Sequence, residues 1–496
     1  MRRNGVLLPI FSLPGKYGIG TFSKEAYKFV DKISKAGMAY WQILPLGQTG
    51  YGDSPYQSFS TFAGNPYFID LEQLIKEGLL KKKECDALDF GDNPECIDYE
   101  KMYNNRYTIL RTAFGRSNHK NTEEYKKFVS ENDFWIKDYA LFMAIKNSYD
   151  GKSYMFWDED IRLRQEKKLK ELRVKYSNEI DFYIFLQYKF MEQWMALKKY
   201  ANDSGISIIG DIPIYVALDS ADTWSEPKNY LFDKDGRPKG VAGTPPDLFS
   251  KTGQLWGNPL YDWKYLKSTG YKWWIDRMRH CMKLYDVIRV DHFRAFDEYY
   301  FIPYKDKTAI GGRWVKGPGF DLFKTMKSEL GEINVVAEDL GTLTDSVLKL
   351  VERCGYPGMK VMEFAFDPKH DNPYLLHNHV RNSYAYTGTH DNDTIVGWYR
   401  TLDKKTKKFV DDYMGFDEET DEDIAWKFIR AVMSSTAMVS IIPMQDYLAL
   451  GSEGRINIPS TLGGNWTYRM SEKDFDKKLI DKILYYTKVY KRSEKL

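Results

Sequence analysis

The sequence predicts an α/β fold, a (β/α)8 TIM barrel with inserted, largely helical subdomains. The chain of 496 residues is long enough for one large barrel with insertions or for two to three domains. Short runs rich in Val and Ile recur along it and end in polar or acidic residues, and segments with helical spacing separate them. This alternation is typical of buried parallel strands connected by helices, in a closed barrel or in an open doubly wound sheet.

The positions of the reactive side chains favour the barrel. Asp211, Asp291 and Glu338 stand at the carboxyl ends of different predicted strands. In a barrel these ends meet at one mouth, whereas an open sheet spreads them along an edge and uses mainly its switch point. No glycine-rich phosphate-binding motif opens a helix in this chain, so the nucleotide-binding alternative lacks its phosphate cradle.

Seven segments are predicted as barrel strands because they are short, apolar and bounded by turn residues. They are residues 39–47, 206–216, 287–294, 333–341, 359–366, 385–392 and 438–447. Residues 67–71 are the candidate for the eighth strand. The apolar run at residues 6–10 is too short for the core of a signal peptide, and no run approaches the 18 apolar residues of a membrane span.

The predicted organisation is a single catalytic barrel domain over residues 1–496. Residues 71 and 206 are much further apart than a crossover helix requires, so we expect a largely helical insertion at residues 75–200. Residues 225–270 are rich in Gly, Pro and aromatic residues and are predicted to form an active-site loop region. No all-β pattern follows the barrel, so no C-terminal β-domain is expected.

Composition excludes several classes of function. Lys and Arg number 72 and Asp and Glu 70, so the net charge of +2 gives no strong field for nucleic acid or an anionic membrane. Aromatic residues make up 16% of the chain, which suits either sugar binding or a Tyr-rich core. The four cysteines are scattered without a C-x-x-C pair, which predicts reduced thiols, a cytoplasmic location and no zinc site.

Three carboxylates at three strand ends form the strongest constellation: Asp291, Glu338 and Asp391. Cleavage of a glycosidic bond with retention needs one carboxylate as the nucleophile and one carboxylic acid to protonate the leaving oxygen. The alternative is that such acids only cap the following helices. Three acids beside Arg289 and two histidines favour a catalytic site.

Long motifs then identify a family. They are DSPYQSFSTFAGNPY (53–67), GDIPIYV (210–216), GVAGTPPDLFSKTGQLWGNPLYDW (240–263), IRVDHFR (288–294), AEDLG (337–341) and TGTHDNDT (387–394). Together they resemble the 4-α-glucanotransferases, or amylomaltases, of glycoside hydrolase family 77 in the α-amylase clan. The resemblance extends from residue 7 to residue 470, nearly the whole chain.

The resemblance implies that Asp291 is the nucleophile, Glu338 the general acid/base and Asp391 the stabiliser of the distorted sugar ring. Arg289 lies two residues before Asp291, on the same strand face, and is expected to keep that carboxylate ionised. Glu338 needs a setting that raises its pKa. Asp339 is the competitor for the acid role, but strand alternation points it elsewhere.

The resemblance also implies a set of substrate contacts. His390 and His292 could bond to sugar hydroxyls or could be satisfied core histidines. Asp211 is expected to orient Arg289. The turn and loop residues could contact sugars, or could merely form a turn and pack against the insertion. These predicted contacts are Ser54, Tyr56, Phe249, Trp256, Asn258, Pro259 and Asn465.

The predicted function is transfer of a segment of an α-1,4-glucan to the 4-OH of an acceptor glucose or glucan by a retaining double displacement. An α-1,4-glucan hydrolase with the same acids is one alternative, and a catalytically silent glucan-binding protein is another. The expected partners are linear maltooligosaccharides and α-1,4-glucans, without nucleic acid or membrane. No cofactor and no metal is predicted, and the sequence does not predict the oligomeric state.

Overall fold

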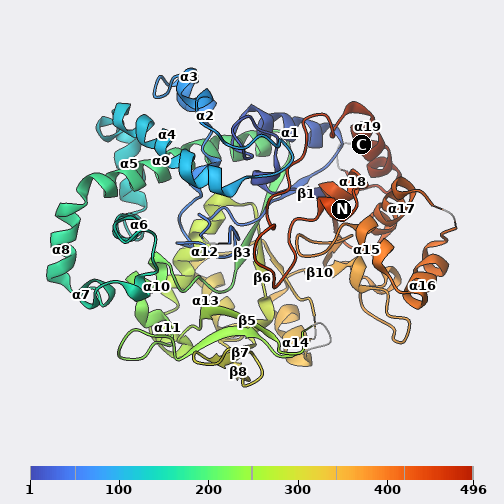
Figure 1. Cartoon of the computed structure of the whole chain (residues 1–496). Helices are drawn as coiled ribbons and strands as arrows, with labels where there is room; N and C mark the ends of the chain where they lie inside the picture. The colour runs from blue at the N-terminus through green and yellow to red at the C-terminus, as the bar shows by residue number, and fades with distance from the viewer. Residues whose placement is uncertain (1, 51, 247–249, 342, 418, 494–496) are drawn as a thin grey trace.

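A closed barrel of parallel strands stands at the centre of the chain in the computed structural model (Figure 1). The structure describes residues 2–50, 52–246, 250–341, 343–417 and 419–493. The strands follow one another around the barrel in the order β1, β12, β11, β10, β9, β6, β3, β2. Their bounds are β1 (Arg3–Leu7), β2 (Tyr40–Gln42), β3 (Ser207–Pro213), β6 (Val287–Asp291), β9 (Val335–Ala337), β10 (Gly358–Val361), β11 (Ser383–Tyr386) and β12 (Val439–Pro443).

This architecture confirms the predicted (β/α)8 barrel, and each of the seven segments predicted as strands overlaps one, although β10 and β11 begin before their predicted segments. The prediction of the eighth strand at residues 67–71 is wrong. Residues 67–71 end a 3-10 turn and begin helix α2, whereas the eighth strand is β1 at the amino terminus. β1 pairs with β12 on one side and with β2 on the other, so it closes the barrel. Its first three residues, Arg3, Asn4 and Gly5, interrupt the apolar pattern by which the other strands were recognised.

Helices cover the outside of the barrel. In α1 (Lys24–Lys35), Ala26, Phe29, Val30 and Ile33 are buried at helical spacing. The Ser23 hydroxyl accepts a hydrogen bond from the Glu25 amide and so caps the helix. The other helices outside the insertion are α10 (Ala221–Ser225), α11 (Trp263–Ser268), α12 (Lys272–Leu284), α13 (Phe320–Leu330), α14 (Asp345–Cys354), α15 (Ile395–Thr401), α16 (Lys404–Met414), α17 (Asp421–Ser434), α18 (Met444–Tyr447) and α19 (Lys477–Val489).

The long connection between β2 and β3 is largely helical and extends to one side of the barrel (Figure 1). Its longest helix, α9, packs against α6 and returns the chain to β3. The helices of this connection are α2 (Leu71–Lys76), α3 (Lys82–Asp86), α4 (Tyr99–Arg116), α5 (Glu123–Glu131), α6 (Ile136–Ser148), α7 (Glu159–Arg162), α8 (Glu166–Lys175) and α9 (Ser177–Asp203).

A small antiparallel sheet lies beside the barrel in the order β5, β4, β7, β8. It contains β4 (Gly240–Thr244), β5 (Gln254–Pro259), β7 (Glu298–Pro303) and β8 (Arg313–Lys316). The sequence predicted a loop region at residues 225–270, but its middle forms β4 and β5. The sequence pattern did not indicate these strands, because the stretch is rich in Gly and Pro and both residue types are depleted in ordinary strands.

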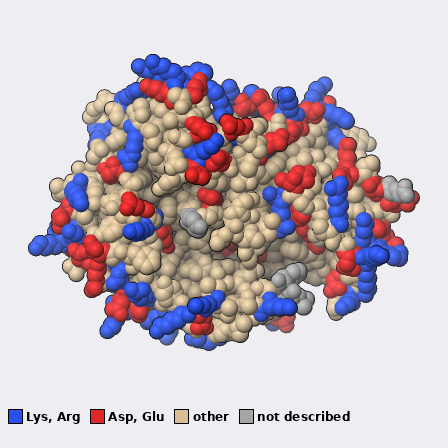
Figure 2. Space-filling model, in the orientation of Figure 1, with Lys and Arg blue, Asp and Glu red and all other residues tan. Residues whose placement is uncertain are grey.

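Charged side chains of both signs are interspersed around the rim of the face seen in Figure 2, and its middle is mostly uncharged. None of the helices in the described part of the chain has an apolar stretch suited to a bilayer span.

Candidate active site

Two carboxylates leave neighbouring strands side by side at the mouth of the barrel. Val290 of β6 pairs with Ala337 of β9, so Asp291 and Glu338 are the next residues on two strands about 4.8 Å apart. The amide of His292, which follows Asp291, donates a hydrogen bond of 2.7 Å to Glu338 Oε2. The topology therefore brings together the two acids that the sequence predicted as a pair.

Glu338 has the environment of a carboxylic acid. Its side chain is only 9% exposed and accepts a second hydrogen bond from the Leu340 amide at 2.9 Å. Burial and the charge of Asp291 raise the pKa of Glu338 to about 7, although Arg289 and the two amide donors favour ionisation. Asp339 points away from the mouth and accepts from the Met359 amide at 2.6 Å, as strand alternation predicted.

Asp291 lies in contact with a buried cation. Arg289 Nη2 is 3.0 Å from Asp291 Oδ1, which is the contact expected from their two-residue spacing on one strand. Desolvation raises the pKa of Asp291 to about 6 even though Arg289 favours the ionised form. The contact with Arg289 favours the ionised form of Asp291, which is the form that a nucleophile requires.

Asp211 holds Arg289 from the adjacent strand. The two residues are register partners in the β3–β6 pair, and Arg289 Nη1 donates to both oxygens of Asp211 at 2.8 and 2.6 Å. Asp211 is fully buried. The Tyr56 hydroxyl donates to the same carboxylate at 2.8 Å, and its ring stacks on His390 with centroids 5.1 Å apart.

The third acid, Asp391, stands in the loop that follows β11. His390 Nε2 lies 3.3 Å from one of its oxygens, and Asn457 Nδ2 donates to the other at 2.7 Å. Against desolvation, the charge of His390 and the hydrogen bonds from His390 and Asn457 hold the pKa of Asp391 well below its ordinary value. The Asp391 carboxylate is about half exposed, so it presents a fixed negative charge to the mouth.

Known proteins resemble this chain over nearly its whole length. A model of the 4-alpha-glucanotransferase family, glycoside hydrolase family 77, matches residues 8–474. The chain belongs to this family. A 4-alpha-glucanotransferase from Clostridium butyricum is 50% identical over 487 residues, which cover 98% of this chain and 100% of that protein. One from Thermus thermophilus is 45% identical over 478 residues and 95% of each chain.

Solved structures of relatives share the fold. An amylomaltase from Streptococcus agalactiae, solved in complex with acarbose, superposes with a TM-score of 0.96 at 40% identity and covers 100% of both chains. An amylomaltase from Corynebacterium glutamicum shares the fold with a TM-score of 0.79 at 20% identity and covers 99% of this chain and 75% of that one.

In this member of the 4-alpha-glucanotransferase family, His292 occupies an uncommon backbone conformation. Its φ is 52°, in the left-handed region that residues other than Gly seldom adopt. The ring packs edge-on against Trp256, with centroids 4.8 Å apart. Burial lowers the pKa of His292 to about 3, so its ring is neutral at physiological pH. The twist at this residue turns the chain so that its amide reaches Glu338.

Two other residues predicted to contact substrate, Asn258 and Asn465, form hydrogen bonds within the chain. Asn258 Nδ2 donates to the Val216 carbonyl at 2.8 Å and its Oδ1 accepts from Gln57, which ties β5 to the exit of β3. Asn465 bonds to Ile458 and Thr461 and so holds its own loop.

The remaining residues predicted to contact substrate include Ser54, in the turn before Tyr56, and two residues of β5. The Ser54 hydroxyl accepts from the Tyr56 amide at 3.3 Å, and Ser54 is half-buried. Pro259 is buried at the end of β5. Trp256 is half-buried. Phe249 lies outside the described residues.

Sequence reasoning missed two residues that support the third acid. Asn457 bonds to the Asp391 carboxylate, and Arg455 donates to the Asp391 carbonyl at 2.9 Å and to the Asn457 carbonyl at 2.8 Å. Both stand in an irregular segment between α18 and α19. Their only signal in the sequence was proximity to Asn465 and Trp466, because no strand or helix period marks such a segment.

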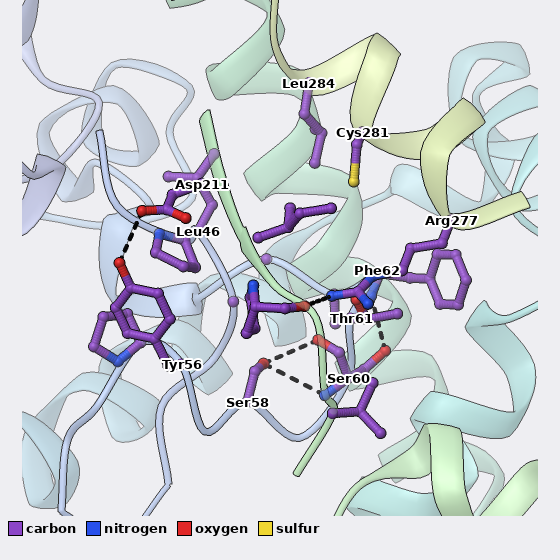
Figure 3. Close-up of a pocket in the computed structure, with 18 of the residues that line it drawn as sticks. Leu46, Tyr56, Ser58, Ser60, Thr61, Phe62, Asp211, Arg277, Cys281 and Leu284 are labelled. Atoms are coloured by element: carbon purple, nitrogen blue, oxygen red, sulfur yellow. Dashed lines mark hydrogen bonds between the residues drawn. The ribbon is translucent and has the colours of Figure 1, made fainter. Parts of the chain in front are cut away.

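A cavity of about 50 Å³ lies behind Tyr56 and Asp211 (Figure 3). Ser60 and Phe62 stand on its other side, and Cys281 of α12 also faces it. A space of this volume is large enough for water but too small for a sugar ring. It therefore has no room for a second sugar subsite.

Proposed function

We propose that this chain is a 4-α-glucanotransferase that transfers a segment of an α-1,4-glucan to the 4-OH of an acceptor glucose or glucan with retention of configuration. The observation that carries the proposal is the adjacent pair Asp291 and Glu338 at the barrel mouth, with Asp291 3.0 Å from Arg289 and the buried Glu338 bonded to the His292 amide. The names of the relatives at 45% and 50% identity support the same activity.

In the first step, Asp291 Oδ attacks the anomeric carbon of the donor while Glu338 gives its proton to the glycosidic oxygen. The bond between that carbon and the leaving oxygen breaks, and the reducing-end part of the glucan leaves with a free 4-OH. In the second step, ionised Glu338 takes the proton of an acceptor 4-OH, whose oxygen displaces Asp291. Two inversions give net retention.

The other residues prepare these two acids. Arg289 favours the ionised form of Asp291, and Asp211 with Tyr56 holds Arg289 in place. The negative charge of Asp391 stabilises the positive charge that develops on the sugar ring in the oxocarbenium-like transition state. His390 lies beside Asp391 and is placed to bond to hydroxyls of the same ring. Ser54, Trp256, Asn258, Pro259, His292 and Asn465 are proposed to shape or contact the glucan subsites.

The expected partners are linear maltooligosaccharides and α-1,4-glucans. Support comes from the Streptococcus agalactiae amylomaltase, which was solved with acarbose. Water competes with the acceptor at the second step, so transfer requires a mouth that holds sugar and excludes water. The cytoplasmic location stays a prediction from the cysteine content.

Incubation of the purified protein with maltotriose alone tests the function. Transfer yields glucose together with a ladder of longer maltooligosaccharides, resolved by chain length over time. Glucose and maltose with nothing longer would replace the transferase by the hydrolase. No change with maltotriose or longer glucans would leave the silent binding protein. Loss of turnover in the Asp291→Asn variant is expected, and unchanged turnover would contradict the assignment of the nucleophile.

A further inference from the structure

The loop that carries Asp391 is anchored by residues that have no part in the proposed reaction. It follows β11 and extends from Thr387 to the start of α15 at Ile395. Asp446, which follows β12 and is 1% exposed, accepts hydrogen bonds from the Thr387 hydroxyl and the Ile395 amide. One buried carboxylate therefore fixes both ends of the loop, and other groups hold its middle.

Asn392 fixes the middle of this loop. Its Oδ1 accepts hydrogen bonds from the Thr389 amide at 3.0 Å and from the Thr389 hydroxyl at 2.8 Å. The same hydroxyl accepts from the Asp391 amide at 3.4 Å. A backbone amide can only donate, so Asn392 must present Oδ1 to Thr389, and its Nδ2 points to the other side. That Nδ2 requires an acceptor.

The acceptor is Glu363, the second residue after β10. Asn392 Nδ2 donates to Glu363 Oε2 at 3.0 Å, and the Glu363 amide donates to the Thr387 carbonyl at 3.3 Å. Glu363 therefore joins the end of β10 to the loop through its backbone and its side chain. A Cβ on Gly388 would lie 2.7 Å from Glu363 Oε1, so the loop packs directly on this carboxyl group.

The surroundings of Glu363 disfavour its ionised form. The residue is 9% exposed, and its Oε1 is buried without a hydrogen-bond partner among the described residues. A buried carboxylate normally has a donor or a cation at each oxygen. The charged groups around Glu363 are Asp446, Asp393 and Arg455, and Arg455 donates to the Asp391 carbonyl. Burial and the charge of Asp446 raise the pKa of Glu363 well above its ordinary value.

The neighbouring acids have the hydrogen bonds that an ionised group requires. Each oxygen of Asp446 accepts a hydrogen bond, and so does each oxygen of Asp393. Only one oxygen of Glu363 accepts one. Donors stabilise the charged form of a carboxyl group, so the proton of this cluster is assigned to Glu363. Its Oε2 can then accept from Asn392 as a carbonyl oxygen.

We propose that Glu363 is a positioning residue, a neutral carboxylic acid that holds Asn392 and thereby sets the position of Asp391 at the barrel mouth. This inference rests on the proposed function, which gives Asp391 its role in the reaction. An ionised Glu363 would add a third buried negative charge beside Asp446 and Asp393. The repulsion would weaken the attachment of the loop to β10.

The first test measures the proton. Glu363→Gln keeps the shape and the acceptor but cannot ionise. In the unfolded chain Glu363 loses its proton above about pH 4.3, whereas in the folded protein it keeps it, so folding of the parent takes up a proton. The unfolding constant of the parent relative to Glu363→Gln should therefore rise about tenfold per pH unit between about pH 5 and pH 7. Urea unfolding at each pH gives this ratio, and a ratio independent of pH would overturn the proposal.

The second test compares two neutral replacements of similar length. Glu363→Gln retains an acceptor for Asn392, and Glu363→Met does not. We expect kcat for maltotriose to stay within about twofold of the parent in Glu363→Gln and to fall about tenfold in Glu363→Met. Asp70→Ala is the control, because Asp70 is a buried carboxylate that accepts from two amides at the start of α2. Its loss should lower stability and leave kcat unchanged.

Equal losses of kcat in Glu363→Gln and Glu363→Met would show that the reaction needs a charge at this position, and would overturn the proposal. Unchanged kcat in Glu363→Met would overturn the positioning role. If Glu363→Met does not fold, as judged by its thermal melt, Asn392→Ala decides in its place, because it breaks the same hydrogen bond from the loop. Failure of the parent protein on maltotriose would reject the transferase function, but the pH dependence of unfolding would still show whether Glu363 is neutral.

Discussion

The amide of His292 donates a hydrogen bond of 2.7 Å to the side chain of Glu338. Because His292 directly follows Asp291, this bond fixes the position of the proposed acid relative to the proposed nucleophile. It favours ionised Glu338, yet burial and the charge of Asp291 outweigh it and raise the pKa to about 7. The two carboxyl groups therefore titrate as an interacting pair.

The first prediction concerns the pH dependence of kcat/KM for maltotriose. Below pH about 6 Asp291 gains a proton and cannot attack, and above pH about 7 Glu338 loses the proton that the leaving oxygen needs. We expect a narrow bell-shaped profile with its maximum between these values. A profile that is flat across both values would contradict the assignment of the two groups.

The second prediction separates the roles of the two acids. Glu338→Ala should lower maltotriose turnover by about 10²–10⁴-fold, the usual contribution of a general acid, and Asp291→Ala should abolish it. With α-maltosyl fluoride as donor, azide should restore turnover in both variants.

The configuration of the azide product distinguishes them. In Asp291→Ala, azide replaces the missing nucleophile and gives the inverted β-azide. In Glu338→Ala, azide attacks the glycosyl-enzyme and gives the retained α-azide. The coupling constant of the anomeric proton in NMR identifies the configuration. If Asp291→Ala gave the α-azide and Glu338→Ala gave the β-azide, the nucleophile and the acid would be reversed.

The third prediction concerns Arg289. Arg289→Gln removes the cation beside Asp291, so the pKa of Asp291 rises and the acidic limb of the pH profile moves to higher pH. The variant also leaves the buried Asp211 carboxylate without its cation, which should lower the free energy of unfolding by about 3–5 kcal/mol. Arg289→Lys keeps the charge and loses the bidentate contact, so it should shift the limb less than Arg289→Gln does.

The fold could be predicted from sequence where strands were rich in Ile and Val. β3, β6 and β12 each contain three such residues with few interruptions, so their apolar character was visible. β1 was missed because Asn4 and Gly5 stand in its first half, and its burial depends on strands from both ends of the chain. Tertiary pairing, rather than local preference, defines that strand.

Some residues of the candidate site could likewise be predicted from the sequence, and others could not. Asp291 and Glu338 could be predicted because each directly follows a strand, and parallel strands deliver such residues to one mouth. Asn457 could not, because it reaches Asp391 from an irregular segment 66 residues further along the chain. Only the folded structure shows that this segment crosses the mouth.

The fourth prediction tests why β1 contains Gly5. A Cβ at this position would lie 2.5 Å from the Tyr40 carbonyl oxygen and 2.8 Å from Ile441 Cδ1, and the backbone of β2 cannot retreat without breaking the barrel. Gly5→Ala should lower the free energy of unfolding by about 1–3 kcal/mol. Gly115→Ala is the control, because Gly115 lies within α4 with open space around it and should be neutral or stabilising. Urea unfolding followed by circular dichroism compares the two.

The fifth prediction concerns the bond from Asn457 to Asp391. Asn457→Ala removes a hydrogen bond of 2.7 Å to an ionised oxygen, and such bonds contribute about 1.5–3 kcal/mol. If Asp391 stabilises the transition state, kcat for maltotriose should fall at least about tenfold. Asn334→Ala, which removes an exposed amide far along the chain from these loops, should leave kcat unchanged.

The pH profile of Asn457→Ala distinguishes a catalytic loss from a structural one. Asn457 is one of the groups that hold the pKa of Asp391 low, so its removal raises that pKa, and Asn457→Asp should raise it further by placing a like charge beside it. A purely structural role would lower kcat equally at every pH and leave the acidic limb near the pH set by Asp291. An acidic limb that moves above that pH, further in Asn457→Asp than in Asn457→Ala, would show that the negative charge of Asp391 is what the reaction uses.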